Sequence, residues 1–129
     1  MSPLTAFIVE DSATIRQNLV ATLEEWAPVQ VVGFAEGATE AIEKLTQSAP
    51  GCDLAIIDVR LKQGSGVDVL AALRTSQSTI RRVVLTNYAT NLVREYCLAL
   101  GADRVFDKSS DVEKLLDYCG TLATELRGG

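Results

Sequence analysis

The most informative absence in this chain of 129 residues is histidine, of which it has none. Histidine is the commonest general base in enzymes and the commonest zinc ligand, so its absence argues against both kinds of site. The chain also cannot form a phosphohistidine of its own. Its three cysteines, at positions 52, 97 and 119, form no CxxC pair, and a structural zinc site is not expected. We expect three free thiols, used as small core residues in a reducing compartment.

Three further features are missing. The N-terminus shows no basic and apolar signal peptide, and no apolar run approaches the roughly 18 residues of a membrane span. Lysine and arginine number 12 against 17 aspartates and glutamates, a net charge of −5, whereas nucleic-acid binding requires a basic face. The one dense pair of cations, Arg81-Arg82, is interpreted as a solvated loop edge. We therefore expect a cytoplasmic protein without a nucleic-acid or membrane partner.

Short apolar runs alternate with amphipathic stretches along the whole chain, whose length fits one domain over residues 1–129. The pattern predicts strands at 4–9, 29–34, 53–58, 80–85 and 103–107, and helices at 12–26, 37–48, 67–73, 91–100 and 110–126. Ser12 and Ser110 are the expected N-caps, Gly101 ends the fourth helix, and Trp26 is expected in the core. Five strand–helix units predict an α/β fold, a parallel sheet covered by helices on both faces.

Polar residues follow the strands at the points where function is found in such sheets. Glu10-Asp11 ends the first strand and Asp58 the third, while the fourth runs into Thr86 and the fifth into Lys108. Three carboxylates at one edge repel one another, so they favour a bound cation. Carboxylate oxygens with room for water suit Mg²⁺. The sequence therefore predicts a magnesium site, with Lys108 as a fixed countercharge.

This set of residues suits phosphoryl transfer. An aspartate, with a reference pKa of about 3.9, is already an ionised nucleophile at neutral pH and needs no general base. The reaction needs positioning and neutralisation of the phosphoryl oxygens. Mg²⁺ and Lys108 would neutralise two of them, and the Thr86 hydroxyl would donate to a third. Asp58 is the best nucleophile because it ends the central strand.

Four motifs, in order along nearly the whole chain, resemble the receiver domain of two-component response regulators. They are FIVEDS at 7–12, DVRL at 58–61 followed by GSG at 64–66, LT at 85–86 and FDKS at 106–109. The resemblance implies a doubly wound (βα)5 flavodoxin-like fold with strand order 2-1-3-4-5. It also implies that Asp58 accepts a phosphoryl group from the phosphohistidine of a sensor kinase or phosphotransfer protein.

The resemblance further implies roles for the neighbouring residues. Asp11, Asp58 and the backbone carbonyl of Arg60 would coordinate Mg²⁺, with Glu10 acting through a water. Lys108 would contact the acyl phosphate, and Thr86 would move toward it. That movement would switch the face formed by the fourth helix, fifth strand and fifth helix, which a downstream protein reads. The domain would not be an enzyme beyond its own phosphorylation and dephosphorylation.

Several residues depart from the family pattern. Val105 replaces the usual aromatic switch residue, and Ser109 replaces the usual proline after the lysine. Asn87 follows Thr86 where a small residue is common, which would narrow access to the phosphoryl group. Arg60 and Tyr88 would flank the pocket and slow the attack of water.

Other functions compete with this interpretation. A flavin binder of the same architecture needs a neutral phosphate loop, which Glu10-Asp11 would not supply. A haloacid-dehalogenase-type phosphatase needs a second aspartate where Arg60 stands. A receiver-like interaction module without phosphorylation is the principal alternative. No output domain is expected, so the chain is a single-domain regulator or an excised receiver, as a monomer or weak homodimer.

Overall fold

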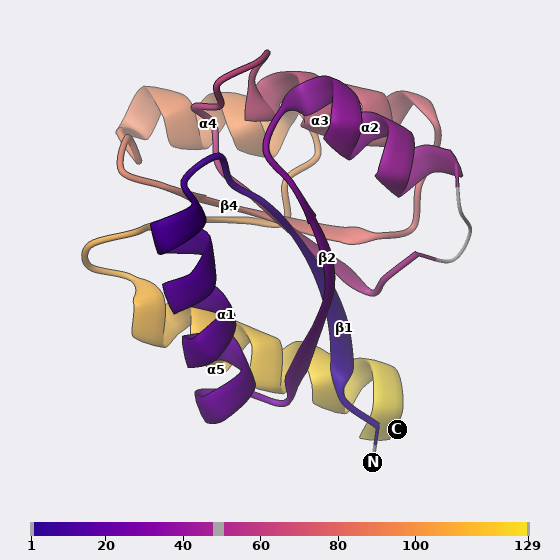
Figure 1. The fold of residues 1–129 in the computed structure, drawn as a ribbon, viewed down its shortest axis with the longest axis vertical. Coiled ribbons are helices and arrows are strands. Elements are labelled where there is room, and N and C mark those ends of the chain that lie inside the picture. The colour runs from indigo at the N-terminus through magenta and orange to yellow at the C-terminus, as the bar shows by residue number, and fades with distance from the viewer. Residues whose placement is uncertain (1, 48–50, 129) are drawn as a thin grey trace.

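Five parallel strands form one sheet with helices on both faces, as Figure 1 shows for this computed structural model, which describes residues 2–47 and 51–128. Their hydrogen-bonded order is β2-β1-β3-β4-β5, and every pair is parallel. The strands are β1 (Leu4–Val9), β2 (Val29–Ala35), β3 (Leu54–Ile57), β4 (Arg81–Thr86) and β5 (Arg104–Asp107). The predicted doubly wound α/β fold and its strand order are confirmed.

The helices return the chain between successive strands. They are α1 (Ala13–Trp26), α2 (Ala38–Gln47), α3 (Gly66–Thr75), α4 (Asn91–Ala99) and α5 (Val112–Ala123), with a π-helical turn η1 (Thr124–Gly128) after α5. Helices α1 and α5 cover one face of the sheet, and α2, α3 and α4 cover the other (Figure 1). Residue 48, where the second helix was expected to end, lies outside the described residues. None of the described helices is long and apolar enough to cross a membrane.

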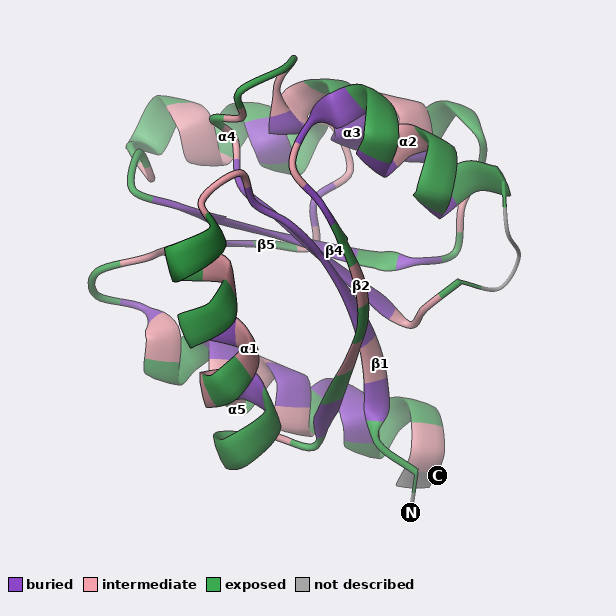
Figure 2. Cartoon of the chain, in the orientation of Figure 1, coloured by how far each residue is buried: buried purple, intermediate pink, exposed green. Residues whose placement is uncertain are grey.

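The core consists of two apolar layers, one on each side of the sheet. Successive residues of a strand point to opposite faces, so Phe7 and Val9 join the layer under α2, α3 and α4, while Ile8 joins the layer under α1 and α5. Both layers contain a buried cysteine, Cys97 in one and Cys119 in the other. Figure 2 shows the buried residues concentrated along the sheet and the inner helix faces. This packing holds the strand ends in fixed positions.

Three details of the chain differ from the sequence-based expectations. Trp26 is 70% exposed, because the buried stripe of α1 is limited to Leu19 and Leu23. Ser12 does cap α1, but the N-cap of α5 is Asp111 and not Ser110. The pair Arg81-Arg82 begins strand β4, and the Arg82 side chain is buried, donating to the backbone carbonyls of Ile80 and Ser78.

Two glycines are required by the backbone where it turns or packs closely. Gly101 has a φ of +106° and ends α4 in the left-handed conformation, as predicted. Gly66 begins α3 directly against the end of β3, and a Cβ there would lie 2.2 Å from the carbonyl oxygen of Asp58. The glycine therefore allows α3 to approach the end of β3.

Candidate functional site

The polar residues predicted at the strand ends do converge on the carboxyl edge of the sheet. Val9 is paired with Ile57 in the β1–β3 register, so Glu10 and Asp58 follow side by side. The Asp58 N–H donates to the carbonyl of Val9 (3.0 Å), which continues the pairing beyond the strands. The Lys108 N–H donates in the same way to the carbonyl of Thr86 (3.0 Å). These backbone hydrogen bonds therefore fix the backbone positions from which the Asp58 and Lys108 side chains extend.

Lys108 lies between two carboxylates. Its ammonium nitrogen is 2.6 Å from Asp58 Oδ2 and also forms an ion pair with Glu10 Oε1. The side chains are 12% exposed for Lys108, 10% for Asp58 and 4% for Glu10. Burial lowers the pKa of Lys108, but the bonds to Asp58 and Glu10 outweigh it, so the pKa is raised above its ordinary value. The lysine is a permanent positive charge at neutral pH.

Glu10 is held by further contacts besides Lys108. Its Oε2 accepts from the Ser12 N–H (2.9 Å), and its backbone carbonyl accepts from the Arg16 guanidinium (2.8 Å). The first turn of α1 therefore orients this carboxylate toward the lysine. Asp58 is less constrained, since its Oδ1 accepts only a long bond from the Arg60 N–H (3.4 Å). Asp58, the nucleophile predicted from the sequence, thus keeps one carboxylate oxygen that only one weak hydrogen bond occupies.

Thr86, at the end of β4, and the loop that follows it also belong to the site. Thr86 is fully buried, and its hydroxyl oxygen accepts from the Tyr88 N–H (3.2 Å). The Arg60 guanidinium donates to the Tyr88 hydroxyl (3.0 Å) and lies 4.4 Å from the centre of its ring. Arg60 and Tyr88 therefore join the loops after β3 and β4 at the mouth of the site, in agreement with the flanking position expected for them.

Asp11 is half-buried, and within the described ranges it has no hydrogen bond or ion pair. The described residues contain no group of three acidic or cysteine side chains arranged to hold a metal ion. Magnesium is usually bound through one or two carboxylates and several waters, so it does not require such a group. Asp11 and the freer oxygen of Asp58 supply the right donor chemistry.

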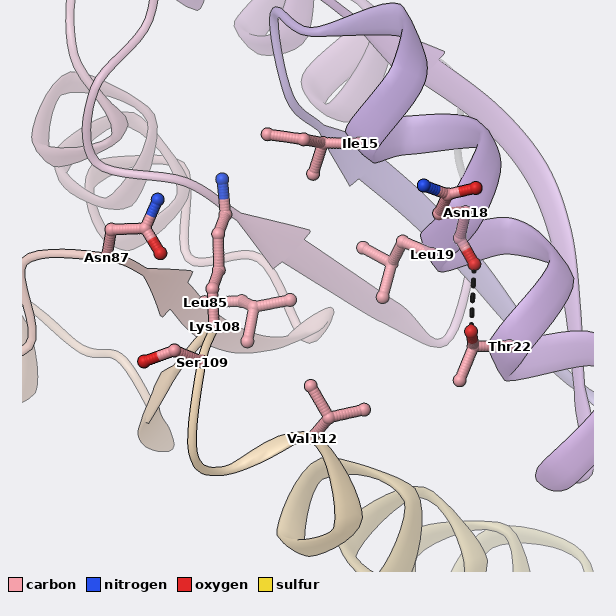
Figure 3. A pocket seen from close by; sticks show the side chains of 9 residues that line it. All are labelled: Ile15, Asn18, Leu19, Thr22, Leu85, Asn87, Lys108, Ser109 and Val112. Carbon is pink, nitrogen blue, oxygen red and sulfur yellow. Dashed lines mark hydrogen bonds between the residues drawn. The ribbon is translucent and has the colours of Figure 1, made fainter.

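A cavity of about 340 Å³ opens beside Lys108, between α1 and the loop that leads into α5 (Figure 3). Apolar side chains from α1, β4 and α5 form most of its wall, and Asn87, Lys108 and Ser109 border it. The apolar residues are Ile15, Leu19, Leu85 and Val112. Asn87 therefore lines the space next to the lysine. The apolar wall was not predicted, because its residues come from three separate segments.

The loop after Lys108 is organised by Asp107. Asp107 Oδ1 accepts from the Ser109 N–H (2.8 Å) and hydroxyl (2.5 Å) and from the Ser110 N–H (3.2 Å). These bonds hold the pKa of Asp107 below its ordinary value. A proline at position 109 would supply neither of the two donors of Ser109. The hydrogen bonds of this loop therefore depend on Ser109, which replaces the usual proline.

Arg94 connects three elements beside Val105, and sequence reasoning missed it. Its guanidinium donates to the carbonyls of Ala89 (3.1 Å) and Val105 (2.7 Å) and pairs with Asp111 (3.3 Å). The Asp107 N–H donates to the same carboxylate (2.9 Å). The Asp107 N–H and the guanidinium hold the pKa of Asp111 below its ordinary value. An arginine thus links the loop after β4 to β5 and the start of α5.

A family model described as the response regulator receiver domain matches residues 6–119. The chain belongs to this family. Among relatives of the receiver domain, the acid tolerance regulatory protein ActR of Rhizobium meliloti is 33% identical over 109 residues, covering 84% of this chain and 54% of the relative. The DNA-binding transcriptional activator DevR/DosR of Mycobacterium tuberculosis is 32% identical over 85 residues, covering 66% and 38%.

A solved structure supports the same assignment. The crystal structure of a response regulator protein from Burkholderia pseudomallei with a phosphorylated aspartic acid, calcium ion and citrate has a TM-score of 0.76 and 26% identity. It covers 97% of this chain, which in turn covers 71% of that one. This receiver domain spans about half or less of the length of the two relatives described above, so their DNA-binding and regulatory activities are not properties shown for it.

Proposed function

We propose that this receiver domain accepts a phosphoryl group on Asp58 from the phosphohistidine of a sensor kinase or phosphotransfer protein. The principal support is the Lys108 ammonium 2.6 Å from Asp58 Oδ2 at the carboxyl edge of the sheet. A carboxylate oxygen of Asp58 attacks phosphorus, the P–N bond breaks, and the imidazole leaves on the donor protein. The product is an acyl phosphate on Asp58 and a histidine whose ring takes up a proton.

The surrounding residues neutralise and orient the transferred group. Lys108 pairs with a phosphoryl oxygen, and the buried Thr86, whose oxygen accepts from the Tyr88 N–H, donates its own O–H to another. Asp11, Asp58 and the Arg60 carbonyl would hold Mg²⁺, with Glu10 acting through a water. When bound, the ion neutralises charge on the phosphoryl oxygens. The response regulator protein from Burkholderia pseudomallei, whose structure holds both a phosphorylated aspartic acid and a calcium ion, supports the pairing of an aspartyl phosphate with a divalent cation.

Output is proposed to pass through the face of α4, β5 and α5. Movement of Thr86 would shift the loop that contains Tyr88 and Ala89, and Arg94 connects this loop to β5 and Asp111. Because Val105 supplies no aromatic switch residue, the arginine offers a different physical connection. A downstream protein would read the resulting surface. The free cysteines favour a reducing compartment, and we place the domain in the cytoplasm.

Intact mass after incubation with acetyl phosphate and Mg²⁺ tests the proposal. We expect one added phosphoryl group on the wild-type chain and none on Asp58→Asn. Asp53→Asn is the matched control, since it makes the same change at the other end of β3 and should retain the added mass. A chain that takes up nothing from acetyl phosphate or from a phosphohistidine donor would instead be an interaction module without phosphorylation.

A further inference from the structure

Trp26, the single tryptophan of the chain, lies on the surface at the last position of α1 with 70% of its area exposed. The helix has 14 residues, so at about 1.5 Å per residue Trp26 lies about 20 Å along α1 from the end next to Glu10. It is therefore remote from Asp58 and has no part in phosphoryl transfer. A large exposed indole needs another explanation, because aromatic residues are enriched in protein interfaces.

Trp26 borders a surface hollow of about 470 Å³ together with Glu113, Leu116 and Asp117 of α5. We name these four residues the Trp26 pocket. Helices α1 and α5 lie on the same face of the sheet (Figure 1), and the pocket lies between them. It combines an indole ring, an aliphatic side chain and two carboxylates one helical turn apart.

The two carboxylates have no partner in the part of the chain that the structure describes: neither the Glu113 side chain nor the Asp117 side chain forms a hydrogen bond or ion pair there. The cation next to them in sequence, Lys114, pairs with Asp111 (3.6 Å). The pocket therefore presents two carboxylates without an ion-pair partner among the described residues, beside an aromatic ring.

Three other aromatic rings of the chain, those of Phe34, Tyr88 and Tyr118, lie close to an arginine guanidinium. The guanidinium carbon of Arg16 lies 4.0 Å from the ring centre of Phe34, and those of Arg60 and Arg104 lie 4.4 Å and 5.5 Å from the rings of Tyr88 and Tyr118. No cation lies over Trp26 among the described residues. Tryptophan is the best cation–π acceptor of the aromatic side chains, so its ring is an unused site for the same contact.

We propose that the Trp26 pocket binds an arginine side chain in a basic segment of a partner protein. The planar guanidinium stacks on the indole while its N–H groups reach Glu113 and Asp117 in a fork that lysine cannot reproduce. The methylene groups of the arginine pack on Leu116. A second copy of this chain, with its own charge of −5, is a poorer occupant than a basic segment.

Because Trp26 is the sole tryptophan, its fluorescence reports directly on the pocket. The full chain is titrated with a blocked peptide of alternating alanine and arginine, and with matched lysine and glutamate peptides. We expect a saturable change with the arginine peptide, a weaker one with lysine and none with glutamate. Equal responses to arginine and lysine would overturn the proposed guanidinium recognition.

Charge-matched variants separate the pocket from general attraction of a basic peptide. Glu113→Gln with Asp117→Asn should weaken binding by about tenfold or more, because both carboxylate contacts are lost. Glu43→Gln with Glu95→Gln makes the same change in net charge at exposed sites on α2 and α4, and should retain most of the affinity. Similar losses in both variants would overturn the proposal. So would a fluorescence change with protein concentration alone, since a second copy would then cover Trp26.

Discussion

Strand β3 joins two charge clusters, one at each end of the sheet. At its amino end Asp53 Oδ2 accepts from the N–H (2.9 Å) and hydroxyl (3.0 Å) of Thr5 and forms an ion pair with Arg127. At its carboxyl end Asp58 shares Lys108 with Glu10, and Asp11 is close in sequence without a partner among the described residues. The amino end has one carboxylate for one cation, whereas the carboxyl end has three for one.

The difference separates a structural cluster from a functional one. The carboxylate at the amino end is saturated by the chain itself, so it fixes the C-terminal turn η1 to the sheet and leaves little attraction for a ligand. The carboxyl end keeps an excess of negative charge around a fixed lysine. In the proposed function, that excess attracts Mg²⁺ and the lysine contacts a phosphoryl oxygen. In the proposed function, the same strand therefore provides stability at one end and reactivity at the other.

The largest expected effect comes from Lys108→Met, which leaves Glu10 and Asp58 buried without their cation. The free energy of unfolding should fall by about 3 kcal/mol in chelator, as measured by urea denaturation. Added Mg²⁺ should restore part of the loss, because the carboxylates can then bind an ion that the folded state alone holds. Lys62→Met is the control: it removes an exposed lysine whose ion pair with Glu36 is 3.9 Å long, and it should change the free energy of unfolding little. Equal losses in the two variants would contradict the comparison.

A smaller effect is expected from Asp53→Asn at the other end of β3. The loss of the charged contact with Arg127 and the weaker bond to Thr5 should lower the free energy of unfolding by about 1–2 kcal/mol. Mg²⁺ should restore none of it, because no acidic excess is created. Asp117→Asn is the control for an exposed aspartate without a partner among the described residues, and it should be near neutral. Recovery of Asp53→Asn by Mg²⁺ would mean that the amino end also attracts metal.

The charge clusters at the two ends of β3 should also lose their contributions to the free energy of unfolding at opposite extremes of pH. Burial raises the pKa of Asp53, but the bonds from Thr5 and Arg127 outweigh it and leave the pKa lowered. Its contribution is therefore complete above the unfolded pKa of about 3.9 and is lost as the pH falls through the lower folded value. The pKa of Lys108 is raised, so its contribution is complete below about 10.4 and is lost as the pH rises through the folded value. Urea denaturation of wild type, Lys108→Met and Asp53→Asn across pH should show each variant's deficit shrinking at its own extreme.

The smallest effect concerns the mouth of the carboxyl end. Replacing Arg60 and Tyr88 by alanine removes a contact worth about 0.5–1 kcal/mol at an exposed site, and opens Asp58 to water. The rate at which Asp58 loses its phosphoryl group should increase about twofold to fivefold. Intact mass, recorded over time after the donor is removed, measures this rate. Replacing Arg104 by alanine removes the comparable contact on Tyr118, which involves no residue of the site, and is the control. An unchanged rate in the double variant would remove this role.

The strand ends were predictable from sequence because parallel strands place their carboxyl ends at one edge, whatever the details of packing. Asp58 and Lys108 were therefore found together, 50 residues apart. Trp26 was misplaced because helical spacing gives the side of the helix on which a residue lies but not how much of that side its neighbours cover. Arg82 and Arg94 were missed for another reason: their partners are backbone carbonyls, which no side-chain pattern reveals.

Arg94 and Asp111 also determine how the sheet ends. β5 is an edge strand, and the outward carbonyl of Val105 and N–H of Asp107 are the groups that another strand would need for pairing. Both are already occupied by these two side chains. The sheet is therefore closed to extension at this edge, and a protein recruited there must recognise side chains instead of adding a strand.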